Sequence, residues 1–204
     1  MNVITRSVGP WPMNSYALIC QHTRQSVLFD PGADPDTLEQ MLVGTNPMAI
    51  VLTHTHPDHI GALSEMKRRL RVPVWGHGGP HFDHANIQID HSFANGERFF
   101  VGTHYVIARY APGHIGDMIC YIVNNAPIAI VGDTIFAGGP GKTWSADDFK
   151  TTLHTLKNVI LPLDDDTICY PGHGSAFRLG DIRAHVQDFV NREHPDDFYG
   201  DAEW

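Results

Sequence analysis

The segment His54–His59, which reads HTHPDH, constrains the fold of this chain more than any other, because four of its six side chains can bind a metal ion. It follows the apolar run 49–52, whose length and β-branched residues predict a buried strand ending near Thr53. In extended backbone, residues two apart project to the same side, so His54 and His56 can reach one ion. The sequence therefore predicts metal ligands at the end of a strand.

Pro57 indicates that the chain then turns into a helix, because proline breaks a strand and suits the first helical turn. Ile60 and Leu63 continue with helical spacing. Asp58 and His59 then lie at the turn, where they can reach a second ion. Two imidazoles for one ion and a carboxylate with an imidazole for another form a dinuclear arrangement. A solvated histidine-rich loop is the alternative, and the rarity of histidine disfavours it.

The composition is that of a globular protein that does not bind nucleic acid. The 204 residues are 42% hydrophobic and 18% charged, enough for one domain over residues 1–204 with a substantial core. The net charge of −9 disfavours phosphate binding, and the basic cluster 67–69 is interpreted as a solvated helix face. Residues 1–14 lack the apolar core of a signal peptide, and no stretch has the length of a membrane span. We expect a cytoplasmic protein acting on a small molecule, with no nucleic-acid or membrane partner and an unknown oligomeric state.

Strand and helix patterns run along the whole chain. The sequence predicts strands over residues 3–4, 16–20, 26–29, 49–52, 72–75, 99–101, 105–108, 118–123, 127–131 and, as the last, 167–170. It predicts further helices over residues 34–41, 145–160 and 179–190, the second of them capped by Ser145 with Asp148. The acidic tail 194–204 is expected to be frayed. Three cysteines within strands are expected to be buried and free of disulfides: Cys20, Cys120 and Cys169.

Segment 76–95 has no clear pattern, although it contains four histidines: His77, His81, His84 and His91. No matching set of carboxylates accompanies them. The segment is either a loop on the substrate side of the protein or a stretch of surface histidines, and we favour the second interpretation.

Three more potential ligands each lie in a glycine-containing turn just after a predicted strand: His114, Asp133 and His173. Turns at one edge of a sheet converge, so residues far apart in sequence can meet there. A neighbouring glycine lets the backbone pass close to an ion or a substrate. Each turn alone is weak evidence, and the set of seven potential ligands together is strong.

This pattern resembles the metallo-β-lactamase-fold metallohydrolases, and the resemblance runs from the Asp30-Pro31-Gly32 turn to His173. It implies an α/β fold, an αββα sandwich of two mixed sheets flanked by helices, with the metals at one edge. In the family pattern the first metal takes His54, His56 and His114, the second takes Asp58, His59 and His173, and Asp133 bridges the two. True β-lactamases of this fold lack the bridging aspartate, so the resemblance implies a different substrate.

Within the family, the segment Gly132–Gly139 followed by Lys142 is most similar to the glyoxalase II (hydroxyacylglutathione hydrolase) group. The resemblance implies that Lys142 binds the carboxylate of a glutathione thioester, with Trp144 lining the pocket; a solvated loop cation is the alternative. Two features depart from that group. The segment after His173 is shorter than the helical domain that completes the glutathione site, and it lacks the tyrosine used there. The turn 115–117 after His114 is also unusual.

The expected function is hydrolysis of a thioester or ester by a hydroxide that bridges two metal ions. Asp58 orients this nucleophile and shuttles its proton. Imidazole and carboxylate ligands suit zinc best, with iron or manganese as alternatives. Asp30 either supports a ligand histidine or only forms its turn. The alternative functions on this scaffold are an iron-dependent persulfide dioxygenase and a lactone hydrolase; an RNA nuclease does not fit the acidic charge.

Overall fold

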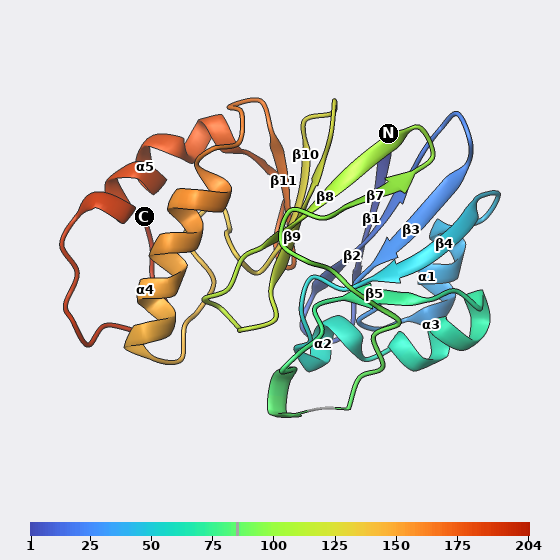
Figure 1. The fold of residues 1–204 in the computed structure, drawn as a ribbon, viewed down its shortest axis with the longest axis horizontal. Helices are drawn as coiled ribbons and strands as arrows, with labels where there is room; N and C mark the ends of the chain where they lie inside the picture. Colours follow the sequence, from blue (N-terminus) through green and yellow to red (C-terminus); the bar gives the residue numbers. More distant parts are fainter. Residues whose placement is uncertain (85) are drawn as a thin grey trace.

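The computed structural model describes residues 1–84 and 86–204, which form two β-sheets packed face to face with helices on their outer faces (Figure 1). The first sheet holds six strands in chain order: β1 (Asn2–Val8), β2 (Met13–Ile19), β3 (Gln25–Phe29), β4 (Asn46–Val51), β5 (Val74–Gly76) and β6 (His91–Ser92). Strands β1 to β3 are antiparallel and β3 to β6 are parallel, so the sheet is mixed.

The second sheet is also mixed and holds six strands in the reverse of chain order: β12 (Phe177–Arg178), β11 (Ile168–Pro171), β10 (Ile128–Gly132), β9 (Ile119–Val123), β8 (His104–Tyr110) and β7 (Arg98–Val101). Only β10 and β11 pair in parallel. The chain thus builds one sheet from its first half and the other from its second half, as the colours of Figure 1 show.

The helices cover the outer faces of the two sheets. Figure 1 shows α1 (Pro35–Met41) and α3 (Leu63–Leu70) beside the first sheet, and α4 (Ala146–Thr155) and α5 (Leu179–Asn191) beside the second. Two short helices lie in loops, α2 (Pro57–Ile60) and the 3₁₀ turn η1 (Phe82–His84), and α4 continues into one π-helical stretch, η2 (Leu156–Ile160). Among the described residues, none of these helices combines the length and apolar character needed to cross a membrane.

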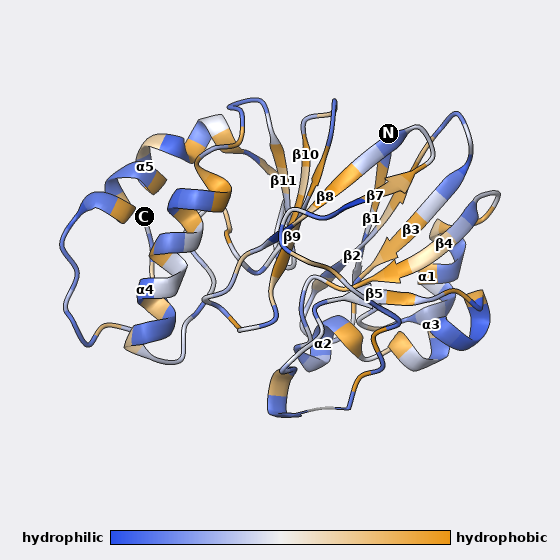
Figure 2. Ribbon diagram, in the orientation of Figure 1, coloured by the Kyte–Doolittle hydropathy of each residue, from blue (hydrophilic) through white to orange (hydrophobic). Residues whose placement is uncertain are grey.

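Side chains alternate between two separate cores along each inner strand. On β2, Tyr16 and Leu18 point into the core between the sheets, whereas Ala17 and Ile19 point toward α1 and α3. Every residue of β2 is buried, including the polar Asn14 and Ser15. Figure 2 shows hydrophobic residues along the strands of both sheets, among them β3 and β8. A third core lies between the second sheet and α4 and α5, and it includes Phe149. The four layers are therefore joined by three apolar interfaces.

The turns that follow β3, β4, β8, β10 and β11 bring residues that are distant in sequence to one edge of the two sheets. Asp30 follows β3, and His54 lies three residues after the end of β4. In the second sheet, Asp133 follows β10, His173 follows β11 by two residues, and His114 follows β8. The predicted convergence of these turns depends on this topology.

The predicted strands are confirmed to within a few residues, but the sequence analysis missed β6 and β12, so 167–170 is not the last strand. Both missed strands have only two residues. The expected helix after Pro57 is split into α2 and α3. It breaks where the backbone of Gly61 passes the carbonyl of Gly32 too closely for any side chain and Ala62 N–H binds the carbonyl of Pro31.

Residues 194–204 are not frayed, so that prediction is wrong. The ring of Phe198 packs on Phe149 with centroids 4.6 Å apart, and Trp204 donates its backbone N–H to the carbonyl of Gly138. The acidic residues of the tail suggested a solvated end, whereas the partly buried side chains of Phe198 and Trp204 pack against the helical layer. The three cysteines are buried and free, as predicted.

Replacing Phe29 by alanine is expected to lower the free energy of unfolding by about 3–5 kcal/mol, because its ring is fully buried between the sheets, 5.2 Å from that of Tyr121. Urea denaturation followed by circular dichroism measures the change. Phe100→Ala is the matched control: Phe100 is 63% exposed on β7, so its loss is expected to cost within about 0.5 kcal/mol. Equal losses in the two variants would contradict the assignment of this core.

Candidate metal centre

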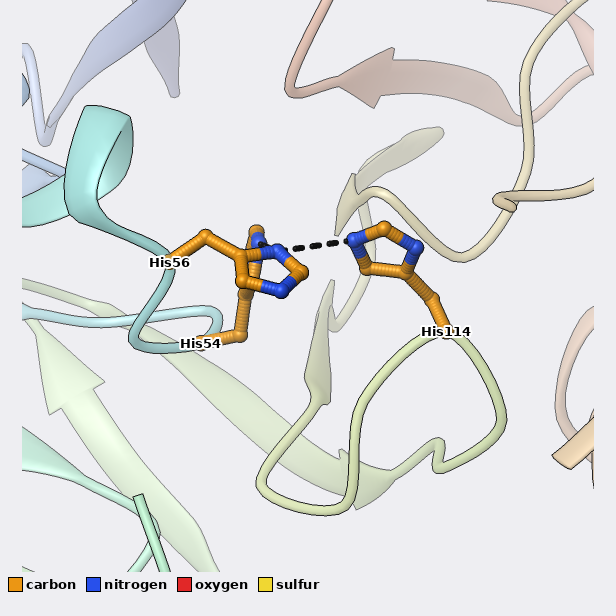
Figure 3. A group of neighbouring side chains, drawn as sticks. All are labelled: His54, His56 and His114. Atoms are coloured by element: carbon orange, nitrogen blue, oxygen red, sulfur yellow. Dashed lines mark hydrogen bonds between the residues drawn. The ribbon is translucent and has the colours of Figure 1, made fainter. Parts of the chain in front are cut away.

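Three histidine nitrogens meet at the edge between the two sheets (Figure 3). His56 Nδ1 lies 3.0 Å from His54 Nε2 and 2.9 Å from His114 Nε2. A tetrahedral zinc ion with Zn–N bonds of about 2.0 Å holds its nitrogens about 3.3 Å apart. The group is therefore close to the geometry of one metal ion with three imidazole ligands.

A second group lies beside the first and consists of Asp58, His59 and His173. His173 Nε2 is 3.2 Å from Asp58 Oδ2, and the possible ligand atoms of the three residues all lie within 4.8 Å of one another. Asp58 and His59 belong to α2, whereas His173 follows β11 in the other sheet. This group offers one carboxylate and two imidazoles to an ion.

Asp133 lies between the two groups. Its Oδ2 is 3.6 Å from His114 Nε2 of the first group and 3.7 Å from His173 Nε2 of the second, and its Oδ1 is 3.5 Å from His59 Nε2. Gly172 is required at this point, because a Cβ there would lie 2.0 Å from Asp133 Oδ1. The seven residues named from the sequence are thus brought together.

In His114 and His173, the hydrogen bond made by Nδ1, the ring nitrogen that faces away from the centre, determines that Nε2 faces it. His114 Nδ1 donates to the carbonyl of Lys142 at 2.7 Å, and His173 Nδ1 donates to the carbonyl of Pro12 at 3.1 Å. A carbonyl oxygen can only accept, so Nδ1 carries a hydrogen in both rings, and Nε2 presents a lone pair whenever the ring is neutral. Both rings are therefore oriented for binding a cation.

Asp30 performs the same task for His54 and His59 from a buried position. Its Oδ1 accepts Thr53 N–H at 2.7 Å, and its Oδ2 accepts the Thr53 hydroxyl at 2.7 Å and His59 Nδ1–H at 3.1 Å. Since that hydroxyl donates to Asp30, its oxygen accepts from His54 Nδ1 at 3.0 Å. Asp30 also has a positive φ of 48°, so it forms its turn and in addition contacts the candidate ligand histidines, two roles that the sequence analysis gave as alternatives.

Burial keeps the first group of histidines neutral. It lowers the pKa of His54 well below its usual value, helped by the nearby charge of His59, and it lowers the pKa of His56 to about 4. Burial also lowers the pKa of His114. Neutral rings carry the lone pair that a metal ion requires.

Carboxylates dominate the electrostatics of the second group. Burial opposes ionisation of Asp58, but the hydrogen bond from His173 and the charge of His59 outweigh it and bring its pKa to about 2. Burial would likewise lower the pKa of His59, but the bond to Asp30 and the charges of Asp133 and Asp58 raise it. The same negative charges attract a metal cation.

Two buried atoms provide a test of whether a cation fits. Within residues 1–84 and 86–204, His59 Nε2 and Asp133 Oδ1 are buried without a hydrogen-bond partner. Both atoms are acceptors when His59 donates through Nδ1, so they form no hydrogen bond with each other although they lie 3.5 Å apart. A cation between them satisfies both, and the donor set of imidazole and carboxylate suits zinc, iron or manganese.

Lys142, the predicted substrate residue, lies beside the centre, and its backbone carbonyl and its side-chain ammonium have different partners. Its carbonyl accepts from His114, a role that the sequence analysis missed. Its ammonium lies 3.2 Å from a carboxylate oxygen of Asp201 and 5.2 Å from the ring centroid of Trp144. The ammonium is half exposed and remains within reach of a substrate.

His81 and Phe82 of segment 76–95 lie against the metal centre, and the preferred interpretation of the histidines is partly wrong. His84 and His91 are exposed, as expected. His81 is only 10% exposed and binds Asp117, which the sequence analysis did not identify as a functional residue. The only available signal was the position of Asp117, an acid three residues after a predicted ligand.

A cavity of about 400 Å³ opens beside the first group of ligands. Trp144 lines it, as the resemblance implied, together with His56, Phe82, His114, Ile115, Gly116 and Asp148. A substrate in this cavity lies next to the proposed metal ligands.

Comparison with known proteins agrees with this architecture. The family model described as the metallo-beta-lactamase superfamily matches residues 8–173. The chain is 31% identical over 186 residues to "Probable metallo-hydrolase YqgX" of Bacillus subtilis, covering 82% of this chain and 87% of that protein. It is 29% identical over 200 residues to "Hydroxyacylglutathione hydrolase GloC" of Haemophilus influenzae, covering 88% and 94%. The crystal structure of the BLEG-1 B3 metallo-beta-lactamase superposes with a TM-score of 0.80 at 28% identity, covering 94% of this chain and all of that one.

Replacing Asp30 by asparagine is expected to weaken metal binding by about 10–100-fold. The new amide group puts a donor opposite either Thr53 or His59, both of which already donate to this side chain. Competition with a chromogenic chelator measures the affinity. Asp34→Asn is the matched control, because Asp34 also has a positive φ and accepts one backbone N–H, from Gly9, outside the metal centre. If both variants bind metal like the unmodified protein, Asp30 does not orient the ligands.

Proposed function

The chain belongs to the metallo-β-lactamase superfamily, and from this premise we propose that it is a metal-dependent hydrolase that cleaves a thioester or ester at a dinuclear centre. The observation that carries the proposal is the position of Asp133 between two complete groups of nitrogen and oxygen donors. A structural metal site needs one closed group of ligands, whereas two adjacent groups at an open edge suit hydrolysis.

We assign one ion to His54, His56 and His114, a second to Asp58, His59 and His173, and Asp133 to both. Zinc is the proposed metal, because it is commonly held by imidazole and carboxylate donors. Iron and manganese accept the same donors and are the alternatives.

When bound, two divalent cations supply a water of lowered pKa and polarise a substrate carbonyl. The residues of the chain supply the rest. Asp58 has one oxygen beside His173 and a second oxygen with which it orients the attacking water and accepts its proton. A thiolate leaves without much help from a general acid, so a thioester places the smallest demand on these residues.

The thioester class has support outside the metal centre. The GloC relative, which the chain matches over 94% of its length, is named for an acylglutathione, which is a thioester. Lys142 places an ammonium group near the cavity beside His114. We propose that the ammonium exchanges its exposed partner, Asp201, for a carboxylate of the substrate.

Metal analysis combined with a panel of substrates tests the proposal. We expect about two metal ions per chain and faster hydrolysis of S-lactoylglutathione than of an acyl-homoserine lactone, an aryl ester or a chromogenic cephalosporin. Chelation is expected to abolish turnover, and added zinc, iron or manganese to restore it. Full activity after chelation, or oxygen uptake with glutathione persulfide and a single iron, would sink the hydrolase proposal; preference for the lactone or the cephalosporin would refute the thioester class.

Asp58→Ala and Asp133→Ala are each expected to lower kcat by about 10²–10⁴-fold, because the first removes the proton acceptor and the second removes the shared carboxylate. Circular dichroism is expected to stay native, since neither side chain belongs to an apolar core. Asp83→Asn is the control: Asp83 is an exposed acid near the centre but outside both groups, and its φ of 49° is tolerated by asparagine. Near-native activity in either alanine variant would refute the assigned roles.

A further inference from the structure

Asp117 ties segment 81–82 to the metal centre through one oxygen. Its Oδ2 accepts the hydroxyl of Thr55 at 2.5 Å and lies 3.1 Å from His81 Nδ1. The Thr55 hydroxyl oxygen in turn accepts the backbone N–H of Phe82 at 2.8 Å. Because Thr55 lies between two proposed ligands in the sequence, these bonds connect the segment directly to the HTHPDH turn.

The burial of Asp117 shows that this connection is built into the fold. Its side chain is fully buried, and among the described residues its Oδ1 has no hydrogen-bond partner. A buried carboxylate is costly unless the surrounding structure holds it in place. The turn that carries it is fixed from the other side as well, because the Tyr110 hydroxyl donates to the carbonyl of Gly116 at 2.7 Å.

The result of this connection is the position of Phe82. Its ring lies edge to face with that of His56, with centroids 4.7 Å apart, and is 38% exposed. Phe82 lines the cavity beside the metal centre, where Trp144 and Ile115 contribute further apolar surface. Within the described part of the chain Phe82 belongs to none of the three apolar cores, so its place depends on the contact with His56 and on the bond to Thr55, which Asp117 holds.

We propose that Asp117 is a positioning residue that holds Phe82 as one wall of the substrate cavity, and that Phe82 and Trp144 select a substrate with an uncharged, apolar acyl group. This inference rests on the proposed thioester or ester hydrolysis and specifies its substrate class.

The charges around the cavity agree with this class. Among the described residues Asp148 is the one acid that lines it. Its carboxylate accepts the hydroxyl of Ser145 at 2.7 Å, and Ser145 caps α4 by accepting the N–H of Asp148. An anionic acyl group in the cavity would face this carboxylate. The ammonium of Lys142 lies over the ring of Trp144 and next to Asp201, so a charged part of the substrate can bind there while the acyl group occupies the apolar cavity.

Thioesters of one thiol, N-acetylcysteamine, with acetyl, hexanoyl, phenylacetyl and succinyl groups test the proposal on the metal-loaded protein. We expect kcat/KM for the hexanoyl and phenylacetyl compounds to exceed that for the acetyl compound by at least about tenfold, and the succinyl compound to be the poorest. In Phe82→Ala and Trp144→Ala this preference is expected to shrink toward unity, because kcat/KM for the hexanoyl and phenylacetyl compounds falls further than kcat/KM for the acetyl compound.

Variants of the anchor separate positioning from general stability. Asp117→Ala and His81→Ala are expected to lose the apolar preference as Phe82→Ala does, with metal content unchanged. Asp117→Asn is expected to keep it, because both hydrogen bonds go to a single oxygen that an amide retains. Asp90→Ala is the matched control. Asp90 is likewise a carboxylate that anchors its loop, by accepting from Val74 N–H and Lys67, but it lies away from the metal centre. A loss of preference in Asp90→Ala as large as in Asp117→Ala would overturn the role of Asp117.

A binding measurement separates this inference from the proposed function. S-hexyl-N-acetylcysteamine, a thioether that cannot be hydrolysed, is expected to bind at least about tenfold more tightly than the S-methyl compound in calorimetry, and Phe82→Ala is expected to remove the difference. If no thioester is cleaved but this difference is found, the proposed function fails and the cavity assignment stands. If the thioesters are cleaved without any acyl preference, or the two thioethers bind equally, the cavity assignment is wrong.

Discussion

The seven candidate ligands gathered at the open edge between the two sheets are the constraint on which the rest of the structure depends. The unprotonated nitrogen of a neutral imidazole and the oxygens of a carboxylate only accept hydrogen bonds, so these atoms cannot satisfy each other. His59 Nε2 and Asp133 Oδ1 show the conflict most clearly, because both are buried and, within the described part of the chain, have no partner. Bound cations resolve this conflict, which is why we regard the arrangement as a metal centre and not as a polar defect.

The fold maintains this arrangement from outside the ligand set. Asp30 fixes Nδ1 of His59 directly and Nδ1 of His54 through Thr53, and the carbonyls of Lys142 and Pro12 fix two other rings. These supports come from both halves of the chain, so the two sheets must pack before the nitrogens face one another. A metal ion that binds across this edge therefore also holds the two sheets together.

The loops around the centre connect the chemistry to substrate choice. Asp117 uses the same turn as His114 to hold segment 81–82, and the tail holds the loop that carries Lys142 through Trp204 and the carbonyl of Gly138. The first contact places an aromatic wall beside the metal ligands, and the second stabilises the carbonyl that orients a ligand. Specificity in this protein thus depends on loops anchored to the metal-binding turns themselves.

The sequence by itself determined most of the strands and the seven candidate ligands, because strand patterns, the spacing of HTHPDH and the glycine-containing turns after predicted strands are local, whereas the four-layer fold was implied by resemblance to a known family. Only the tertiary structure decided what these turns touch. Asp117 stood out only as part of an unusual turn, His81 looked like a surface histidine, and residues 194–204 looked like a frayed tail. Each of them contacts residues that are distant in sequence, as His81 contacts Asp117 and Trp204 contacts Gly138. The local sequence around a residue contains no information about a partner that only folding brings near.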